Sequence, residues 1–154
     1  MQLTEKEKAL LRDLKEQEQV CVEKYSKYST EANDTQLQAL FSKIGQAEQQ
    51  HLDTINQILN GTIPQMQSGG NQQKQQATFT QTYTTVDASQ DKKNDCYLCT
   101  DLLANEKHVS GTYNICIFEF KNTQIRDALN HIQKEEQEHG EQLYQYMAQN
   151  GMYS

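Results

Sequence analysis

Glu48-Gln-Gln-His51 and Glu136-Gln-Glu-His139 share one pattern, a glutamate followed three residues later by a histidine. The two copies are 88 residues apart, and the same offset aligns Glu18 with Glu106. In each half the upstream glutamate precedes the Glu-x-x-His pair by 30 residues. The sequence therefore resembles a duplicated helical hairpin in which each half supplies one glutamate and one Glu-x-x-His pair.

The first copy lies within a run whose apolar residues recur at helical spacing. Thr4, with Glu7 three residues later, has the pattern of a capping box, so we expect the first helix to begin there. The second helix should start near Thr35 and end at Asn60-Gly61, a common pair at helix ends. Each of these two helices carries an acidic residue on an otherwise apolar stripe.

The second copy follows the same plan. We expect a third helix from about Asp95, a turn at Lys121-Asn122, and a fourth helix that ends at Asn150-Gly151. Short loops within each hairpin and a long connection between hairpins are typical of an all-α, ferritin-like four-helix bundle. We predict one domain over residues 1–154, with helical hairpins at 4–61 and 94–151 joined by a crossover linker at 62–93.

The linker has the composition of an exposed connection. It contains Pro64, Ser68-Gly-Gly70 and the glutamine-rich segment 72–76. A crossover of this length would span the bundle and make the second and third helices parallel. Residues 78–86 alternate in polarity, so they could run extended along the bundle or pair with another chain.

Folding each hairpin at its turn brings four carboxylates and two imidazoles to the middle of the bundle. Buried like charges at close range cannot all stay ionised, so the cluster needs neutralising. Two divalent metal ions would cancel the four negative charges, and an oxygen-rich set with two nitrogens suits iron or manganese better than structural zinc. The predicted ligands are Glu18, Glu48, His51, Glu106, Glu136 and His139, with no separate catalytic side chain assigned. The alternative is a polar or degenerate core.

Other chemically capable residues have simpler interpretations. Tyr25 and Tyr113 lie two turns from the upstream glutamates and could bond to ligand carboxylates or pass electrons, although half-buried packing is the favoured role. Cys96 and Cys99 have redox or metal spacing, but with no second pair they are read as one core and one surface residue. Small core positions are expected for Cys21 and Cys116, and solvated positions for His108 and His131.

Composition excludes several classes of partner. The net charge of −7 and pI near 5.0 argue against a nucleic-acid partner, which requires clustered Lys and Arg. The mean hydropathy is −0.91, and we see no apolar stretch as long as a membrane span or a signal peptide. We therefore expect a soluble protein synthesised in the cytoplasm, with reduced thiols.

The sequence resembles two related groups. The six predicted ligands resemble those of the ferritin-like superfamily that includes rubrerythrin, but Val109 stands where rubrerythrin has a further glutamate and the rubredoxin domain is lacking. More closely, the chain resembles spore coat proteins of the Coat F type. That resemblance is carried by Thr30-Glu-Ala-Asn-Asp-Thr-Gln-Leu-Gln-Ala-Leu-Phe41, Glu48-Gln-Gln-His51, Asn56-Gln-Ile-Leu-Asn-Gly61 and Gln142-Leu-Tyr-Gln-Tyr-Met-Ala-Gln-Asn-Gly-Met-Tyr153.

The resemblance implies a protein of the spore coat that assembles with like chains or with other coat proteins. Its metal site would then serve metal storage or oxidant scavenging. A second hypothesis is a small di-iron or di-manganese oxidoreductase of the ferroxidase, peroxidase or catalase type. A third is a structural filler whose buried carboxylates are partly protonated.

Overall fold

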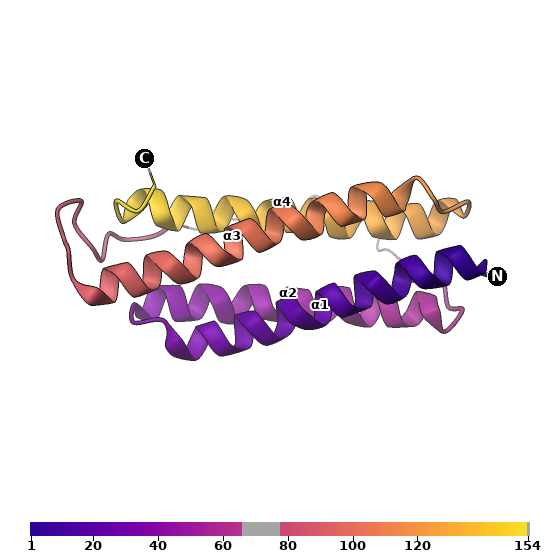
Figure 1. Cartoon of the computed structure of the whole chain (residues 1–154), viewed down its shortest axis with the longest axis horizontal. Helices are drawn as coiled ribbons and strands as arrows, with labels where there is room; N and C mark the ends of the chain where they lie inside the picture. The colour runs from indigo at the N-terminus through magenta and orange to yellow at the C-terminus, as the bar shows by residue number, and fades with distance from the viewer. Residues whose placement is uncertain (66–77, 154) are drawn as a thin grey trace.

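The structure, a computed structural model, describes residues 1–65 and 78–153 and contains four long helices with no strand among those residues. They pack as two hairpins into an elongated four-helix bundle (Figure 1). The all-α four-helix prediction is therefore confirmed. The helices are α1 (Glu5–Glu31), α2 (Thr35–Leu59), α3 (Gln90–Ile117) and α4 (Thr123–Gln149).

Most helix ends lie where their capping residues predict them. The Thr4 side chain accepts from the Glu7 backbone N–H and the Glu7 carboxylate accepts from that of Thr4, which completes the capping box that starts α1. Beyond the C-termini of α2 and α4, Gly61 and Gly151 have φ of 84° and 65°. This left-handed conformation suits glycine, and a Cβ at Gly151 would lie 2.9 Å from Thr85 Cα.

The predicted start of α3 was wrong. This helix begins at Gln90, with Ser89 as N-cap, and therefore extends one turn further toward the N-terminus than Asp95 suggested. The Asp95 carboxylate is fully buried and accepts from the Asn33 and Asp34 backbone N–H groups and from the Tyr83 hydroxyl. The second hairpin thus begins earlier than the predicted 94–151 range. The connection is correspondingly shorter than the predicted 62–93 linker.

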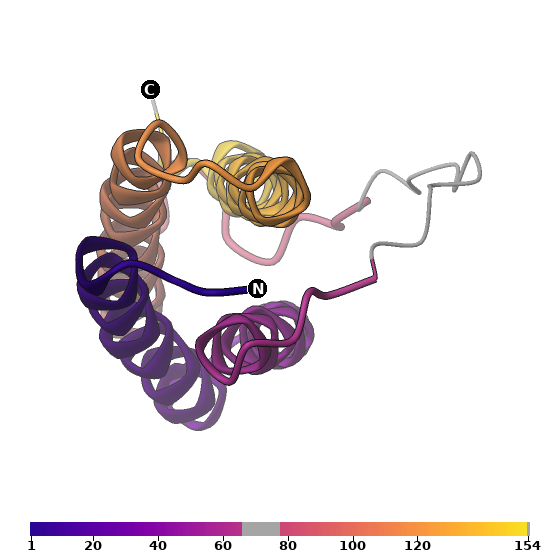
Figure 2. The ribbon, with the colours of Figure 1, turned by 90° about the vertical axis from the view of Figure 1, so that its right-hand side faces the viewer.

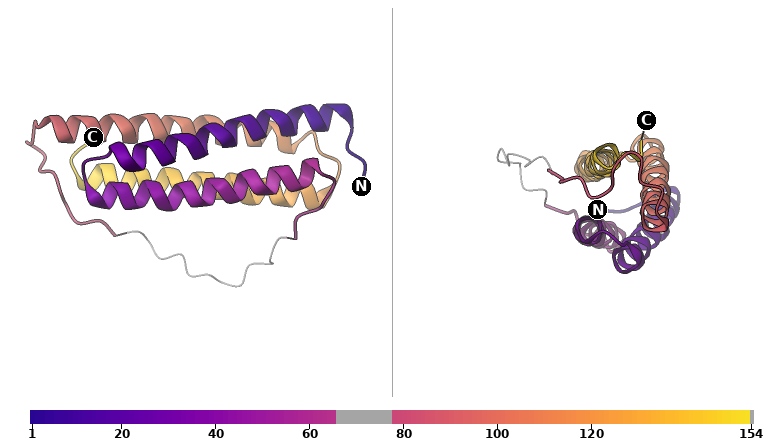
Figure 3. Two further views of the ribbon diagram at one scale, coloured as in Figure 1. Left: turned by 90° about the horizontal axis from the view of Figure 1, so that it is seen from below. Right: turned by 90° about the vertical axis from the view of Figure 1, so that its left-hand side faces the viewer.

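The connection between hairpins follows the end of α2 at one end of the bundle and precedes the start of α3 at the other (Figure 3). Its described ends lie at opposite ends of the molecule, and α2 and α3 run in the same direction as predicted, whereas helices that pack side by side are antiparallel (Figures 1 and 3). Residues 78–85 pack on the chain's own bundle, through Gln36 and Asn150. The predicted loop at Ser68-Gly-Gly70 and the segment 72–76 lie outside the described residues.

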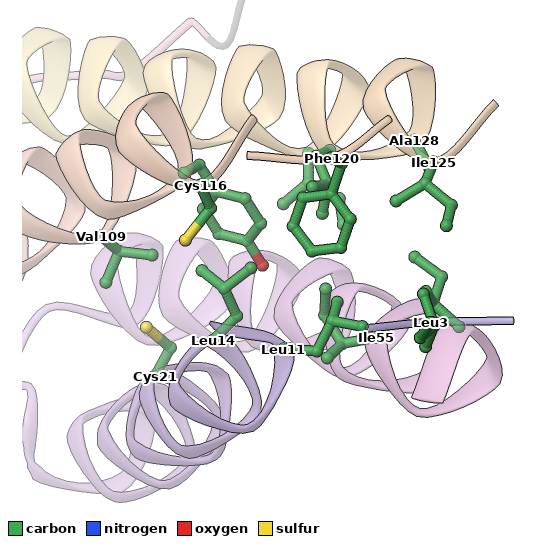
Figure 4. Close-up of a cluster of buried hydrophobic side chains, with 14 residues drawn as sticks. Leu3, Leu11, Leu14, Cys21, Ile55, Val109, Cys116, Phe120, Ile125 and Ala128 are labelled. Atoms are coloured by element: carbon green, nitrogen blue, oxygen red, sulfur yellow. The ribbon is translucent and has the colours of Figure 1, made fainter. Parts of the chain in front are cut away.

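The hydrophobic core has two clusters, one toward each end of the bundle. Viewed end-on, the helices enclose this core, with α1 and α3 along one side and α2 and α4 along the other (Figure 2). One cluster includes Leu11, Leu14, Phe120 and Ile125 (Figure 4), and the other includes aromatic side chains such as Tyr146. On α2, α3 and α4, the segments between the two clusters carry the predicted ligands.

Candidate metal centre

The structure brings all six predicted ligands together at mid-bundle. Each of these residues is at most 5% exposed. They form two overlapping groups, in each of which the potential ligand atoms lie within 4.8 Å of one another. The first group is Glu18, Glu48, His51 and Glu136, and the second is Glu48, Glu106, Glu136 and His139.

Local helix geometry accounts for this convergence. Residues three apart lie on one face of an α-helix, so each Glu-x-x-His pair presents both groups to the bundle interior. The α1–α2 turn lies about midway between Glu18 and Glu48, and the α3–α4 turn about midway between Glu106 and Glu136. Antiparallel packing therefore brings the two glutamates of each hairpin level with each other.

The two histidines present the same ring nitrogen to the carboxylates. His51 Nδ1 lies 2.8 Å from Glu136 Oε1 and 3.2 Å from Glu48 Oε2. Correspondingly, His139 Nδ1 lies 3.0 Å from Glu48 Oε1 and 3.5 Å from Glu106 Oε1. The ring centroids are 5.8 Å apart with planes at 22°. Glu48 and Glu136 thus lie between the two imidazoles, where each can contribute to both groups.

Two tyrosines hold the outer glutamates across the bundle. Tyr25 on α1 donates to Glu106 on α3 at 2.5 Å, and Tyr113 on α3 donates to Glu18 on α1 at 2.6 Å. Both tyrosines are fully buried. The favoured interpretation of half-buried packing was therefore wrong, and the alternative of a hydrogen bond to the carboxylate of a predicted ligand is confirmed. These reciprocal bonds fix one oxygen of each outer glutamate.

The electrostatic environment separates the pKa values of the cluster. Burial, with the neighbouring Glu48 carboxylate, raises the pKa of Glu18 well above its usual range. Burial also raises the pKa of Glu48, but hydrogen bonds from His139 and His51 outweigh this and leave it lowered. For both histidines burial lowers the pKa, but bonds to carboxylates raise it well above the usual value. These raised pKa values favour the protonated forms of Glu18 and of the two histidines.

Several carboxylate oxygens lack a protein donor. Among the described residues, the buried Oε2 atoms of Glu18, Glu106 and Glu136 have no hydrogen-bond partner. The buried Asp95 carboxylate differs, since both of its oxygens accept hydrogen bonds. An unpaired buried carboxylate oxygen is costly, and a cation satisfies it without a donor. The donor set thus fits two divalent ions held by oxygen and imidazole nitrogen.

Glu135 lies at the site although the sequence did not predict it there. Glu135 Oε1 lies 3.2 Å from His51 Nε2 and 3.0 Å from the Nε2 of exposed His131. If His51 Nδ1 were to bind a metal ion, its Nε2–H could donate to Glu135, an arrangement that orients metal-binding histidines. The duplication gives no hint of this role, because the matching position is Ala47. The available signal was the spacing of four residues between His131 and Glu135.

The cysteines do not join the site as ligands. Cys21 and Cys116 are buried in the apolar cluster, as predicted, and Cys99 is buried while Cys96 is half-buried. Burial raises the pKa of the Cys99 thiol well above its usual value, which opposes formation of a reactive thiolate. His108 and His131 are exposed, in agreement with the sequence analysis.

The second hairpin is similar to a known protein family. Residues 94–154 match the family model of the Coat F domain. This Coat F segment contains most of α3 and all of α4, and therefore Glu106, Glu136 and His139. Comparisons with curated proteins and with solved structures found no match. Among the described residues, no helix has an apolar stretch long enough to cross a membrane.

Proposed function

We propose that this chain is a spore coat protein of the Coat F type, a ferritin-like bundle that holds two divalent metal ions at mid-bundle. The match over residues 94–154 supports the coat assignment. The observation that carries the metal site is the pair of four-residue groups that share Glu48 and Glu136. In the coat, the protein assembles with like chains or with other coat proteins.

The division of ligands follows from group membership. Glu18 and His51 belong to one group, Glu106 and His139 to the other, and the two shared glutamates would bridge the ions. Four carboxylates balance the charge of two divalent cations, and the oxygen-rich set favours iron or manganese. The protein would then store iron or manganese, and the bound ions would supply one-electron redox chemistry. Tyr25, Tyr113 and Glu135 hold the ligands in place.

Metal content tests the site directly. Protein purified without chelator and reconstituted with Mn²⁺ or Fe²⁺ should contain two ions per chain by elemental analysis. The double variant Glu48→Ala/Glu136→Ala removes both shared ligands and should abolish loading.

A matched control changes the charge equally without touching the site. Glu23→Ala/Glu141→Ala removes two exposed glutamates and should retain two ions per chain. Equal metal content in both double variants would place the ions elsewhere and contradict the proposal.

Location tests the coat role. The full chain fused to a fluorescent protein and expressed in a spore-forming bacterium should collect in a shell at the spore periphery late in sporulation. A fusion that stays evenly distributed in the cytoplasm of the mother cell, while a known coat protein forms its shell, would contradict the coat role.

A further inference from the structure

A hollow of about 480 Å³ on the α3–α4 face reaches the candidate site. Its lining includes the ligands Glu106 and Glu136, with Leu103, Lys107, Gly140 and Tyr144 around them. Tyr144 and Tyr153 make an edge-to-face contact along this lining, with ring centroids 5.0 Å apart. The hollow therefore connects two of the buried ligands with the surface.

Gly140 lies in the lining of this hollow, and packing does not require a glycine there. A Cβ at this position would lie 3.7 Å from Leu103 Cδ1, an ordinary contact. The φ angle is not positive either, since Gly61 and Gly151 are the glycines with that conformation in the described chain. A glycine inside a helix destabilises the helix relative to alanine. The effect of glycine at position 140 is that no side chain projects into the hollow.

The first half of the chain differs at the matching position. The 88-residue offset pairs Gly140 with Leu52 on α2, which is buried. The duplicated pattern thus places a large apolar side chain in one hairpin and none in the other. The hollow lies on the hairpin that lacks the side chain, α3–α4.

The ligands that line the hollow can accept a cation. Glu106 and Glu136 line it, and the Oε2 atom of each is among the buried oxygens without a partner in the described structure. Lys107 is the one cationic side chain among the described residues of the lining, and it is exposed. A cation that passes this rim would meet two carboxylates that belong to the candidate site.

We propose that the α3–α4 hollow is the entrance through which divalent cations reach the metal site, and that Gly140 keeps it open. This inference rests on the metal site of the proposed function. It separates the rate of loading, set by the hollow, from the number of ions bound, set by the six ligands.

Loading kinetics of Co²⁺, followed by its absorbance in stopped flow, test the entrance. Gly140→Leu introduces the residue of the other hairpin and should slow loading at least tenfold, with two ions still bound at equilibrium. Gly140→Ala should have a smaller effect. Gly111→Leu, at an exposed position of α3 with open space around it, is the matched control and should load at the wild-type rate.

A charge variant keeps the test decisive if the leucine disturbs folding. Lys107→Glu removes the cation from the rim and should speed loading several-fold at low salt, an effect that added salt reduces. Lys43→Glu, exposed on α2, makes the same change in net charge away from the hollow.

The outcomes separate the two proposals. Wild-type loading rates in Gly140→Leu with two ions bound, or equal effects of Lys107→Glu and Lys43→Glu, would overturn the entrance alone. Wild-type protein that binds no Co²⁺ at equilibrium would overturn both the entrance and the metal site.

Discussion

Buried carboxylates occur in two kinds of environment in this bundle. Asp95 is satisfied by backbone N–H groups and a tyrosine hydroxyl, so its role is to join the α1–α2 turn to α3 and the connection. Glu18 and Glu106 each receive one tyrosine bond and keep a buried oxygen without a donor among the described residues. Burial alone therefore does not distinguish a candidate metal ligand, and the incomplete donor sets of Glu18 and Glu106 leave an oxygen on each that a cation could satisfy.

The reciprocal tyrosine bonds predict equal effects of two conservative substitutions. Tyr25→Phe and Tyr113→Phe each keep the ring but remove the donor to a buried carboxylate. Each should lower the free energy of unfolding of the metal-free protein by about 2 kcal/mol, measured by urea denaturation. Tyr97→Phe, at a residue that is 68% exposed, should change stability by less than about 0.5 kcal/mol. Buried variants as stable as this control would show that the bonds do not contribute.

At the residue scale, the sequence identified acidic residues that interrupt an apolar helical stripe, but it did not identify the residues on other helices that contact them. Glu18 and Glu106 were predictable because acidic side chains on apolar helical stripes are unusual. The roles of Tyr25, Tyr113 and Glu135 were not, because each depends on a partner on another helix. Spacing along one helix shows which residues share a face and says little about contacts across the bundle.

The contact between α1 and α3 depends strongly on polar groups. Besides the two tyrosine–glutamate bonds, Asp101 on α3 accepts from Tyr28 at 2.7 Å and pairs with Lys24 at 3.0 Å. Burial raises the pKa of Asp101, but the bonds from Tyr28 and Lys24 outweigh it and leave the pKa lowered. Asp101 is therefore more acidic in the folded protein than in the unfolded chain.

This lowered pKa predicts a pH dependence. A carboxylate with a depressed folded pKa stabilises the protein above its unfolded value of about 3.9, and that contribution is lost as pH falls through the folded value. Asp101→Asn should lower the free energy of unfolding by about 0.5–1 kcal/mol at pH 7, and the difference should shrink as the pH falls through the lowered pKa of Asp101 in the folded protein. Urea denaturation across this range measures it, with exposed Asp127→Asn as the control. A pH-independent difference would contradict the assignment.

Helix ends show how far local signals reach. The starts of α1 and α2 and the ends of α2 and α4 depend on capping residues within a few positions, and these were predicted. The start of α3 was misplaced because Asp95 resembles a local N-terminal signal while its carboxylate binds backbone groups of the α1–α2 turn. A tertiary contact thus used a residue type that usually acts locally.

At the scale of the whole molecule, the duplication predicted the bundle and the meeting of the ligands, because both halves obey the same spacing. What it could not predict are the differences between halves. Glu135 faces His51, while its counterpart is Ala47, and Gly140 lines a hollow, while its counterpart is Leu52. The two candidate metal positions therefore have different surroundings within a nearly symmetric set of predicted ligands.

The central claim is that six buried side chains from four helices are stabilised together by two cations. Anomalous diffraction from crystals of Mn²⁺- or Fe²⁺-loaded protein tests it most directly. We expect two peaks roughly 3.5–4 Å apart, with Glu48 and Glu136 between them and His51 and His139 one at each. Crystals of loaded protein with no peak at mid-bundle, or with peaks only at surface carboxylates, would contradict the claim.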